Sequence, residues 1–114
     1  MALIYKICPH NQWREAERAG VFAGAAVDLE DGFVHLSTAA QVRETAAKHF
    51  QGQRGLLLVA VDPDALGEGL RYEPSRGGDL FPHLYGVLPL SAVRWVKPLS
   101  LDQDGQHVFP SLDG

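Results

Sequence analysis

The hydrophobic pattern of the N-terminal residues changes from that of a strand to that of a helix. Residues 3–8 are rich in β-branched and aromatic side chains, which predicts a first strand. Pro9 follows directly and suits the first position of a helix, where its missing N–H is not needed. Apolar residues then recur at helical spacing up to Ala19, and Gly20 is the residue type that commonly ends a helix. The pattern therefore predicts a strand followed by a helix.

Strict alternation appears next, in residues 33–37. The even-numbered residues of this predicted strand are apolar and require a core. The opposite face carries Phe33, His35 and Ser37. If that face is buried, its polar groups need hydrogen-bond partners. We therefore expect it either to line a pocket or to face solvent.

The segments on either side of this strand are predicted to be a loop and a helix. Residues 21–32 are small and mixed, so we expect a long loop that ends in a turn at its Asp-Gly pair. A second helix is predicted at about residues 38–50. It starts at a capping-box pair of Thr38 with Gln41 and ends at Gly52.

The second half of the chain is predicted to be mainly strands. Residues 55–62 are apolar on both faces, which indicates a central strand. Two further strands are predicted at residues 70–73, ended by Pro74, and at residues 92–97. Residues 104–105 predict a hairpin turn in the tail. The elements together predict an α+β fold with two main helices. We expect one domain over residues 1–114, with a core at about 3–99 and a tail at 100–114.

The composition narrows the class of protein. The chain is 46% hydrophobic and 21% charged, which is ordinary for a globular domain. It lacks both a signal-peptide pattern and an apolar run of the roughly 20 residues that span a bilayer. Cys8 is a single cysteine, so we expect a cytoplasmic protein without disulfides or a membrane partner. A net charge of −4 disfavours DNA as a partner but permits a local pocket for a small anionic ligand.

His35 is the first candidate for chemistry, with Ser37 and Thr38 close behind it. Histidine has a charge state that its surroundings adjust easily, which suits a binding or catalytic pocket. The alternative is structural, because Ser37 and Thr38 are also favoured helix caps and His35 could satisfy a backbone group. A second candidate region is residues 81–86, where His83 and Tyr85 would lie on a pocket rim. Its alternative is a rigid, packed loop.

Groups that bind anions precede this second region. The glycines Gly77 and Gly78 would offer backbone N–H groups, and Arg76 would grip a phosphate or carboxylate. Glu73 would act as a general base or stabilise a developing cation, with a surface salt bridge as the alternative.

A metal site is the third possibility, since the chain has five histidines. A site built on His35 and His83 would need a third ligand from Glu73, His107 or Cys8. No compact ligand spacing supports such a site, so no metal is expected.

Three blocks resemble a bacterial domain-of-unknown-function family. They are residues 4–7, residues 31–38 (DGFVHLST) and residues 77–86 (GGDLFPHLYG). Members of this family are similar in fold to ADP-ribosyltransferases, in which a split, mixed or mostly antiparallel sheet cradles NAD. Residues 34–37 also look like a block of the RNA 2′-phosphotransferases, which share that fold and use NAD as phosphate acceptor.

The resemblance implies a cleft for NAD as substrate, lined by His35 and Ser37. It places Tyr5 and Lys6 on the first strand, where active transferases carry an Arg or a His-Gly-Thr sequence. This chain has Tyr-Lys-Ile there instead. Glu73 and His83 are the polar candidates for the position of the transferases' catalytic glutamate.

The implied mechanism is ribosyl transfer through an oxocarbenium-like cation. Glu73 would stabilise the cation, and His35 would hold a ribose hydroxyl. Tyr85 or Tyr5 would stack on the nicotinamide, while Arg76 with the two glycines would hold the pyrophosphate. The competing hypotheses are a non-catalytic module that binds a small anion or a partner in the same cleft, and a His-coordinated metal enzyme.

Overall fold

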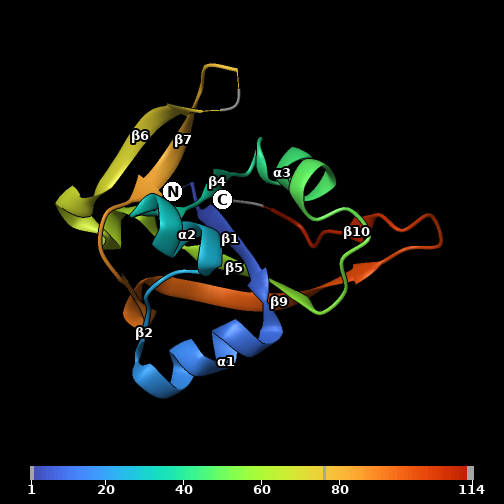
Figure 1. Ribbon diagram of the computed structural model, residues 1–114, viewed down its shortest axis with the longest axis horizontal. Helices are drawn as coiled ribbons and strands as arrows, with labels where there is room; N and C mark the ends of the chain where they lie inside the picture. The colour runs from blue at the N-terminus through green and yellow to red at the C-terminus, as the bar shows by residue number, and fades with distance from the viewer. Residues whose placement is uncertain (1, 76, 113–114) are drawn as a thin grey trace.

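An antiparallel five-stranded sheet forms the centre of the fold (Figure 1). The computed structural model describes residues 2–75 and 77–112. The strands of the sheet follow the order β10 (His107–Val108), β9 (Val93–Leu101), β5 (Leu56–Val61), β1 (Ile4–Pro9) and β4 (Ser37–Thr38). The α+β class is therefore confirmed.

Two small antiparallel sheets and several helices surround this sheet in the described part of the chain. One small sheet pairs β2 (Val21–Phe22) with β8 (Leu88–Pro89), and the other has the order β3 (Val34–His35), β7 (Asp79–Leu84) and β6 (Leu70–Ser75). The α-helices are α1 (His10–Ala19), α2 (Ala26–Asp31) and α3 (Val42–His49). Short 3-10 helices cover Pro63–Ala65, Gly67–Gly69 and Leu90–Ala92. The two main helices that were predicted are α1 and α3, whereas the six-residue helix α2 was not predicted.

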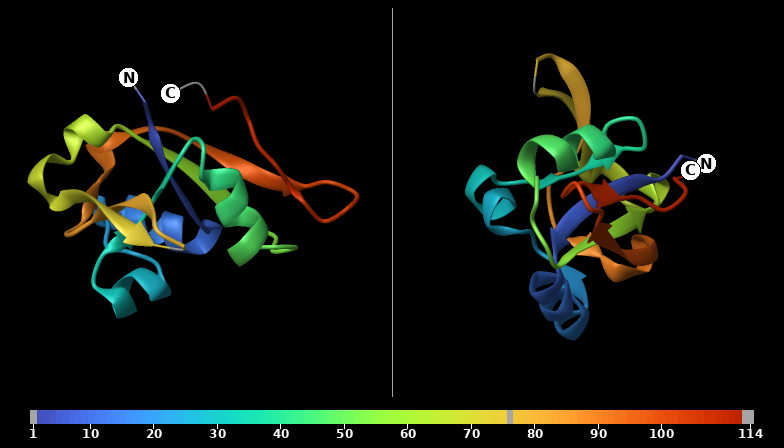
Figure 2. Two further views of the ribbon diagram at one scale, coloured as in Figure 1. Left: turned by 90° about the horizontal axis from the view of Figure 1, so that it is seen from above. Right: turned by 90° about the vertical axis from the view of Figure 1, so that its right-hand side faces the viewer.

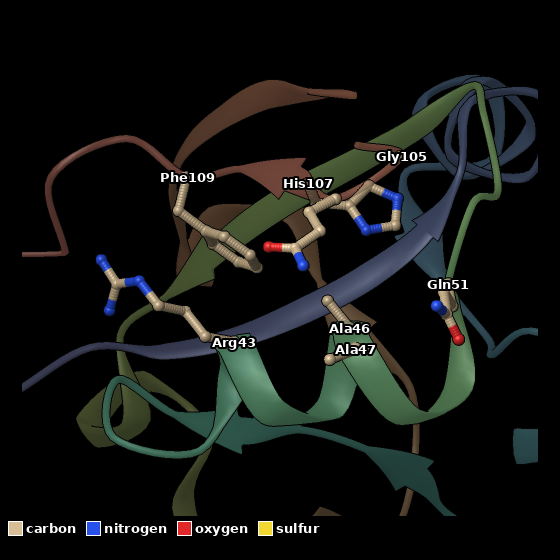
Figure 3. Close-up of a pocket in the computed structure, with 8 residues that line it drawn as sticks. Arg43, Ala46, Ala47, Gln51, Gly105, His107 and Phe109 are labelled. Carbon is tan, nitrogen blue, oxygen red and sulfur yellow. The ribbon is translucent and has the colours of Figure 1, made fainter. Parts of the chain in front are cut away.

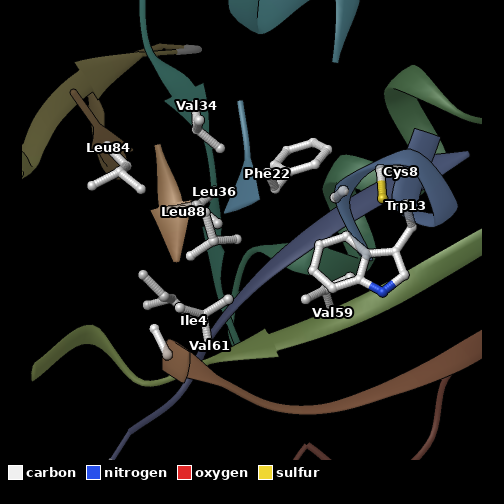
Figure 4. Close-up of a cluster of buried hydrophobic side chains, with 12 residues drawn as sticks. Ile4, Cys8, Trp13, Phe22, Val34, Leu36, Val59, Val61, Leu84 and Leu88 are labelled. Carbon is white, nitrogen blue, oxygen red and sulfur yellow. The ribbon is translucent and has the colours of Figure 1, made fainter. Parts of the chain in front are cut away.

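The strand β5 divides the core into two clusters. It lies between β1 and β9, as predicted for a central strand, and its successive side chains point to opposite faces. Val59 and Val61 belong to a first cluster, which also contains Trp13 of α1 (Figure 4). Leu58 and Ala60 belong to a second cluster on the other face, which is covered by α3. Both faces of the sheet are therefore buried around β5, whereas β9 and β10 are largely exposed.

Glycine ends the first two helices. Gly20 follows α1 with φ 84°, and its N–H donates to the Ala16 carbonyl, which confirms the predicted cap. Gly32 follows α2 in the same way, with φ 86° and a hydrogen bond to the Asp28 carbonyl. The predicted loop over residues 21–32 is therefore wrong, because the Asp-Gly pair is a helix end. Pro9 is the last residue of β1, and α1 begins at His10.

The predicted strand 33–37 passes from one sheet to another. Its first part, β3, pairs with β7, and its second part, β4, pairs with β1. The alternation survives this change, since Val34 and Leu36 are both buried in the first core cluster. Because β4 continues to Thr38, α3 begins only at Val42, and the start predicted at 38 is wrong. The Gln41 side chain accepts from the Thr38 N–H, as the capping pair predicted, but this contact closes a turn before the helix.

Two strands are longer than the sequence predicts. β6 continues through Pro74, which pairs with Leu80. Proline is tolerated there because β6 is an edge strand. β9 extends to Leu101, and the predicted turn at Gly105 joins it to β10.

The residues after this turn pack against the second core cluster through Phe109 and Leu112. The two ends of the described chain lie close together (Figure 2). None of the described helices is long and apolar enough to cross a membrane.

Candidate functional site

A cavity of about 410 Å³ opens where β1 and β4 separate, and we call it the cleft. In the described chain these strands pair only at Ile4 with Thr38 and at Tyr5 with Ser37. Its lining includes side chains from the two strands, from β3 and from both neighbouring helices: Lys6, Val27, His35, Ser37, Thr45 and His49. The volume lies in the range of about 300–1,000 Å³ that is common for small-molecule sites.

Asp28 joins the elements at one side of the cleft. Its carboxylate lies 2.7 Å from the Lys6 ammonium and 2.6 Å from His35 Nδ1. It also accepts the backbone N–H groups of His35 and Ala25. The Asp28 side chain is fully buried. These contacts tie α2 to β1 and β3, and we call Asp28, Lys6 and His35 the Asp28 cluster.

The contacts of Asp28 decide its charge state. Burial alone would raise the pKa of this carboxyl, but the His35 hydrogen bond and the Lys6 charge outweigh burial and lower the pKa to about 2. Asp28 is therefore ionised at neutral pH. Lys6 also donates to the His35 carbonyl over 3.1 Å, so its ammonium contacts both other members of the cluster.

Both ring nitrogens of His35 face carboxylates. Nδ1 faces Asp28, and Nε2 lies 3.0 Å from Asp31 at the end of α2. Ionised carboxylates only accept hydrogen bonds, so both contacts are satisfied when each ring nitrogen carries a proton. The Asp31 side chain is 45% exposed, whereas that of Asp28 is fully buried. The Asp31 contact is therefore the one that an incoming hydroxyl group could replace.

A second histidine–carboxylate pair lies on the neighbouring strands, and we call it the Glu73 cluster. Glu73 Oε1 lies 2.9 Å from His83 Nδ1 and accepts the Tyr85 hydroxyl over 2.6 Å. Hydrogen bonds from Tyr85 and then from His83 lower the pKa of Glu73. The same bond to Glu73 raises the pKa of Tyr85. Because its pKa is lowered, the Glu73 carboxylate is ionised at neutral pH. Its side chain is 36% exposed, so the carboxylate is also accessible.

Phe33 connects the two clusters. Its ring stacks on His83 at a centroid distance of 4.2 Å and tilts against His35 at 4.6 Å and Tyr85 at 5.2 Å. The two imidazoles lie edge to face, with their centroids 5.8 Å apart. The rings fix the distance between the clusters by packing.

One face of the small sheet β3-β7-β6 carries both clusters. His35 pairs with His83 across β3 and β7, and residues two apart on a strand share a face. Ser75 therefore shares a face of β6 with Glu73, and Ser75 lines the cleft, as does His35. The Glu73 cluster therefore shares its sheet face with two residues that line the cleft, His35 and Ser75, although none of its own residues lines the cleft.

A family model described as "Protein of unknown function (DUF952)" matches residues 7–96. The chain belongs to this family. The matched range contains both histidine-bearing blocks and most of the cleft lining.

Solved structures agree with the fold of this DUF952 chain. It is 52% identical to protein CC0527 from Caulobacter crescentus in its X-ray crystal structure, with a TM-score of 0.89 and 93% of each chain covered. The solution NMR structure of CC0527 gives 53% identity and a TM-score of 0.82, with 91% of this chain and 90% of that chain covered. A comparison with curated proteins found no match.

The predicted catalytic residues of the DUF952 chain lie together. His35, Glu73 and His83 occupy one sheet face, within the contacts described above. Of the predicted binding residues, Lys6 and Ser37 line the cleft, and the Ser37 hydroxyl is 3.0 Å from that of Thr45. Tyr85 belongs to the Glu73 cluster.

Other predicted binding residues are placed differently. The Tyr5 side chain touches the cleft, but it is 1% exposed and packs against Trp95 in the second core cluster. Thr38 is the last residue of β4, is not among the residues that line the cleft, and donates its N–H to the Gln41 side chain. Gly77 and Gly78 form the β6–β7 turn, where the Gly78 N–H donates to the Ser75 carbonyl and is not free for an anion. Arg76 lies outside the described residues.

Sequence reasoning missed Asp28 and Phe33. Asp28 lies in the loop that the small, mixed residues 21–32 predicted, and Ala25, which precedes α2, is not a capping residue type that would signal a helix start. The glycine at the end of α2 was the available signal. Among the described residues, no group of three His, Cys, Asp or Glu side chains is arranged to hold a metal ion.

Proposed function

We propose that the cleft binds a ligand of the NAD and ADP-ribose class, on a fold of the ADP-ribosylation type. The observation that carries the proposal is the continuous sheet face that joins the cleft to the Glu73 cluster. It combines a cavity of suitable size, an imidazole fixed by Asp28 and an accessible, ionised carboxylate. Such a combination suits a ligand that carries ribose hydroxyls beside a cationic leaving group.

The proposal assigns the ribose to His35 and Ser37. A ribose hydroxyl that accepts from His35 Nε2 would take the place of Asp31, which leaves the buried contact to Asp28 intact. Tyr85 is the residue proposed to stack on the nicotinamide, since its side chain is exposed whereas the Tyr5 ring is in the core. Arg76 and Gly77 are proposed for the pyrophosphate.

Glu73 suits the chemistry of ribosyl transfer. When the bond between the ribose C1′ and the nicotinamide nitrogen breaks, its electron pair leaves with nicotinamide and a positive charge develops on the ribose. A carboxylate whose pKa is lowered stays ionised and stabilises that charge. The acceptor nucleophile then attacks C1′. We therefore propose a transferase role for the protein, with Glu73 as its catalytic residue.

Calorimetric titration of the folded protein with NAD, ADP-ribose and nicotinamide tests the binding proposal. We expect heat from at least NAD and ADP-ribose, and loss of that heat in His35→Ala. His10→Ala is the matched control, because His10 begins α1 and is not part of the cleft lining. An absence of heat with all three ligands would refute the proposal.

A non-catalytic binding module is the second candidate. The observation in its favour is Lys6, which pairs with Asp28 at the first-strand position where transferases carry a ligand-binding group. Release of nicotinamide from NAD separates the two candidates. Release that is lost in Glu73→Gln supports the transferase, whereas ADP-ribose binding without any release supports the module.

A further inference from the structure

A second cavity lies on the opposite side of α3 from the cleft, and we call it the tail pocket (Figure 3). It has a volume of about 350 Å³. Arg43, Ala46 and Ala47 of α3 form one wall, and His107 and Phe109 of the C-terminal segment form the other. None of these residues lines the cleft.

Contacts far apart in the sequence hold the C-terminal segment in place over this pocket. His107 Nε2–H donates to the Gln53 carbonyl over 2.8 Å, and the Tyr5 hydroxyl donates to the Leu112 carbonyl over 3.4 Å. Asp102 accepts the N–H groups of Asp104 and Gln106 and so fixes the turn before β10. The wall opposite α3 is therefore built by specific contacts.

The charge of the tail pocket is opposite to that of the whole chain. The chain carries a net charge of −4, yet Arg43 is a cation and no acidic side chain lines the pocket in the described part of the chain. The Arg43 guanidinium lies over the Phe109 ring, 5.4 Å from its centroid, and no carboxylate among the described residues pairs with it. A guanidinium held over a ring keeps its in-plane N–H groups available for a carboxylate.

We infer that the tail pocket binds a small planar carboxylate. Its carboxylate pairs with Arg43, and its apolar body packs between the methyl groups of Ala46 and Ala47 and the Phe109 ring. Gln51 and Gln106 supply amide groups at the rim for a polar substituent. This site is separate from the proposed NAD-class site, so the two proposals stand or fall independently.

Titration of the ¹⁵N-labelled protein with benzoate, followed by NMR, tests this inference. We expect saturable shifts confined to the amides of α3 and of residues 102–109. Benzamide has the same shape without the charge and should bind at least about tenfold more weakly, the size expected for the loss of a charged hydrogen bond. Equal binding of benzamide, shifts centred on the cleft, or an absence of saturable shifts would overturn the inference.

Variants check that the binding occurs in this pocket. Arg43→Gln should weaken benzoate binding about tenfold or more. Lys48→Gln removes one positive charge from the same helix outside the pocket and should leave benzoate binding unchanged. Ala47→Leu keeps the charge but fills the cavity from an exposed helix position, so it should abolish binding. Unchanged benzoate binding in either pocket variant would contradict the assignment.

Discussion

The histidines of the two histidine–carboxylate pairs lie opposite each other on paired strands, but one carboxylate is buried and the other is exposed. His35 and His83 face each other across β3 and β7, and each ring binds a carboxylate through Nδ1. The Asp28 side chain is fully buried and binds a lysine and two backbone N–H groups besides its histidine. The Glu73 side chain is 36% exposed and binds a tyrosine hydroxyl besides its histidine.

The difference in burial indicates a structural role for Asp28 and leaves Glu73 accessible for the proposed chemistry. A buried carboxylate that accepts hydrogen bonds from four donors is not available to a ligand, because binding the ligand would break those hydrogen bonds. The ion pair of an exposed carboxylate contributes little to stability, so losing that contact costs little. Such a carboxylate also remains accessible to a substrate. The Asp28 cluster therefore positions His35, and the Glu73 cluster is the one to which we assign the proposed chemistry.

Replacement of Asp28 by Ala should have the largest effect. It removes the carboxylate that pairs with the buried Lys6 charge and that accepts the His35 and Ala25 N–H groups. We expect the free energy of unfolding to fall by about 3–5 kcal/mol in urea titrations at pH 7. The control is Asp31→Ala, which removes only an exposed contact to His35 and should cost about 0–1 kcal/mol. Similar losses in both variants would refute the structural role of Asp28.

The second prediction concerns acid stability. The pKa of Asp28 is lowered from 3.8 to about 2 in the folded protein, so its contribution to stability is complete above about pH 5 and is mostly lost by about pH 2. Between pH 5 and pH 2, the free energy of unfolding of the wild type should fall by about 2 kcal/mol more than that of Asp28→Asn. Urea titrations at stepped pH measure this difference. Parallel pH profiles would show that Asp28 does not have a lowered pKa.

Glu73→Ala should change stability far less than Asp28→Ala. Its carboxylate is accessible, so water can replace it as the partner of the exposed Tyr85 hydroxyl, and the buried His83 ring loses a single hydrogen bond. We expect the urea midpoint to stay near that of the wild type, whereas nicotinamide release is lost if the transferase proposal holds. A loss of stability comparable to that of Asp28→Ala would make Glu73 a structural residue too.

Tyr85→Phe should have the smallest effect, a change in the pKa of Glu73 alone. The Tyr85 hydrogen bond is the largest cause of the lowered pKa of Glu73. Its removal should move that pKa up toward the usual value for a glutamate, with no change in fold. A ¹³C NMR titration of the Glu73 carboxyl measures the shift. An unchanged Glu73 pKa would show that the hydroxyl does not bind the carboxylate in solution.

The sequence correctly predicted the elements that depend mainly on neighbouring residues in the chain. The central strand β5 followed from its apolar residues, and the end of α1 followed from Gly20. The alternation around His35 and Ser37 correctly gave two faces to this segment. It could not reveal that the segment changes sheets at Leu36, because the pairing partners β7 and β1 are distant in the sequence.

The candidate site was predictable only in part for the same reason. His35 and His83 lie in the two histidine-bearing blocks and Glu73 at the end of a predicted strand, whereas Asp28 lies in a segment without a helix start signal. The six-residue helix α2 is too short to be stable alone, and the contact of Asp28 with Lys6 is a tertiary one. The alternation placed Phe33 on the face of His35, but its stacking on His83 depends on the pairing of β3 with β7 and could not be predicted.

The most direct test of the account is an NMR titration of the ¹⁵N-labelled wild-type protein with ADP-ribose. We expect saturable shifts of the amides that line the cleft, above all those of Lys6, His35 and Ser37, with smaller shifts along β6 and β7 near Glu73. Shifts centred on another surface, or no saturable shifts at all, would contradict the assignment of the cleft.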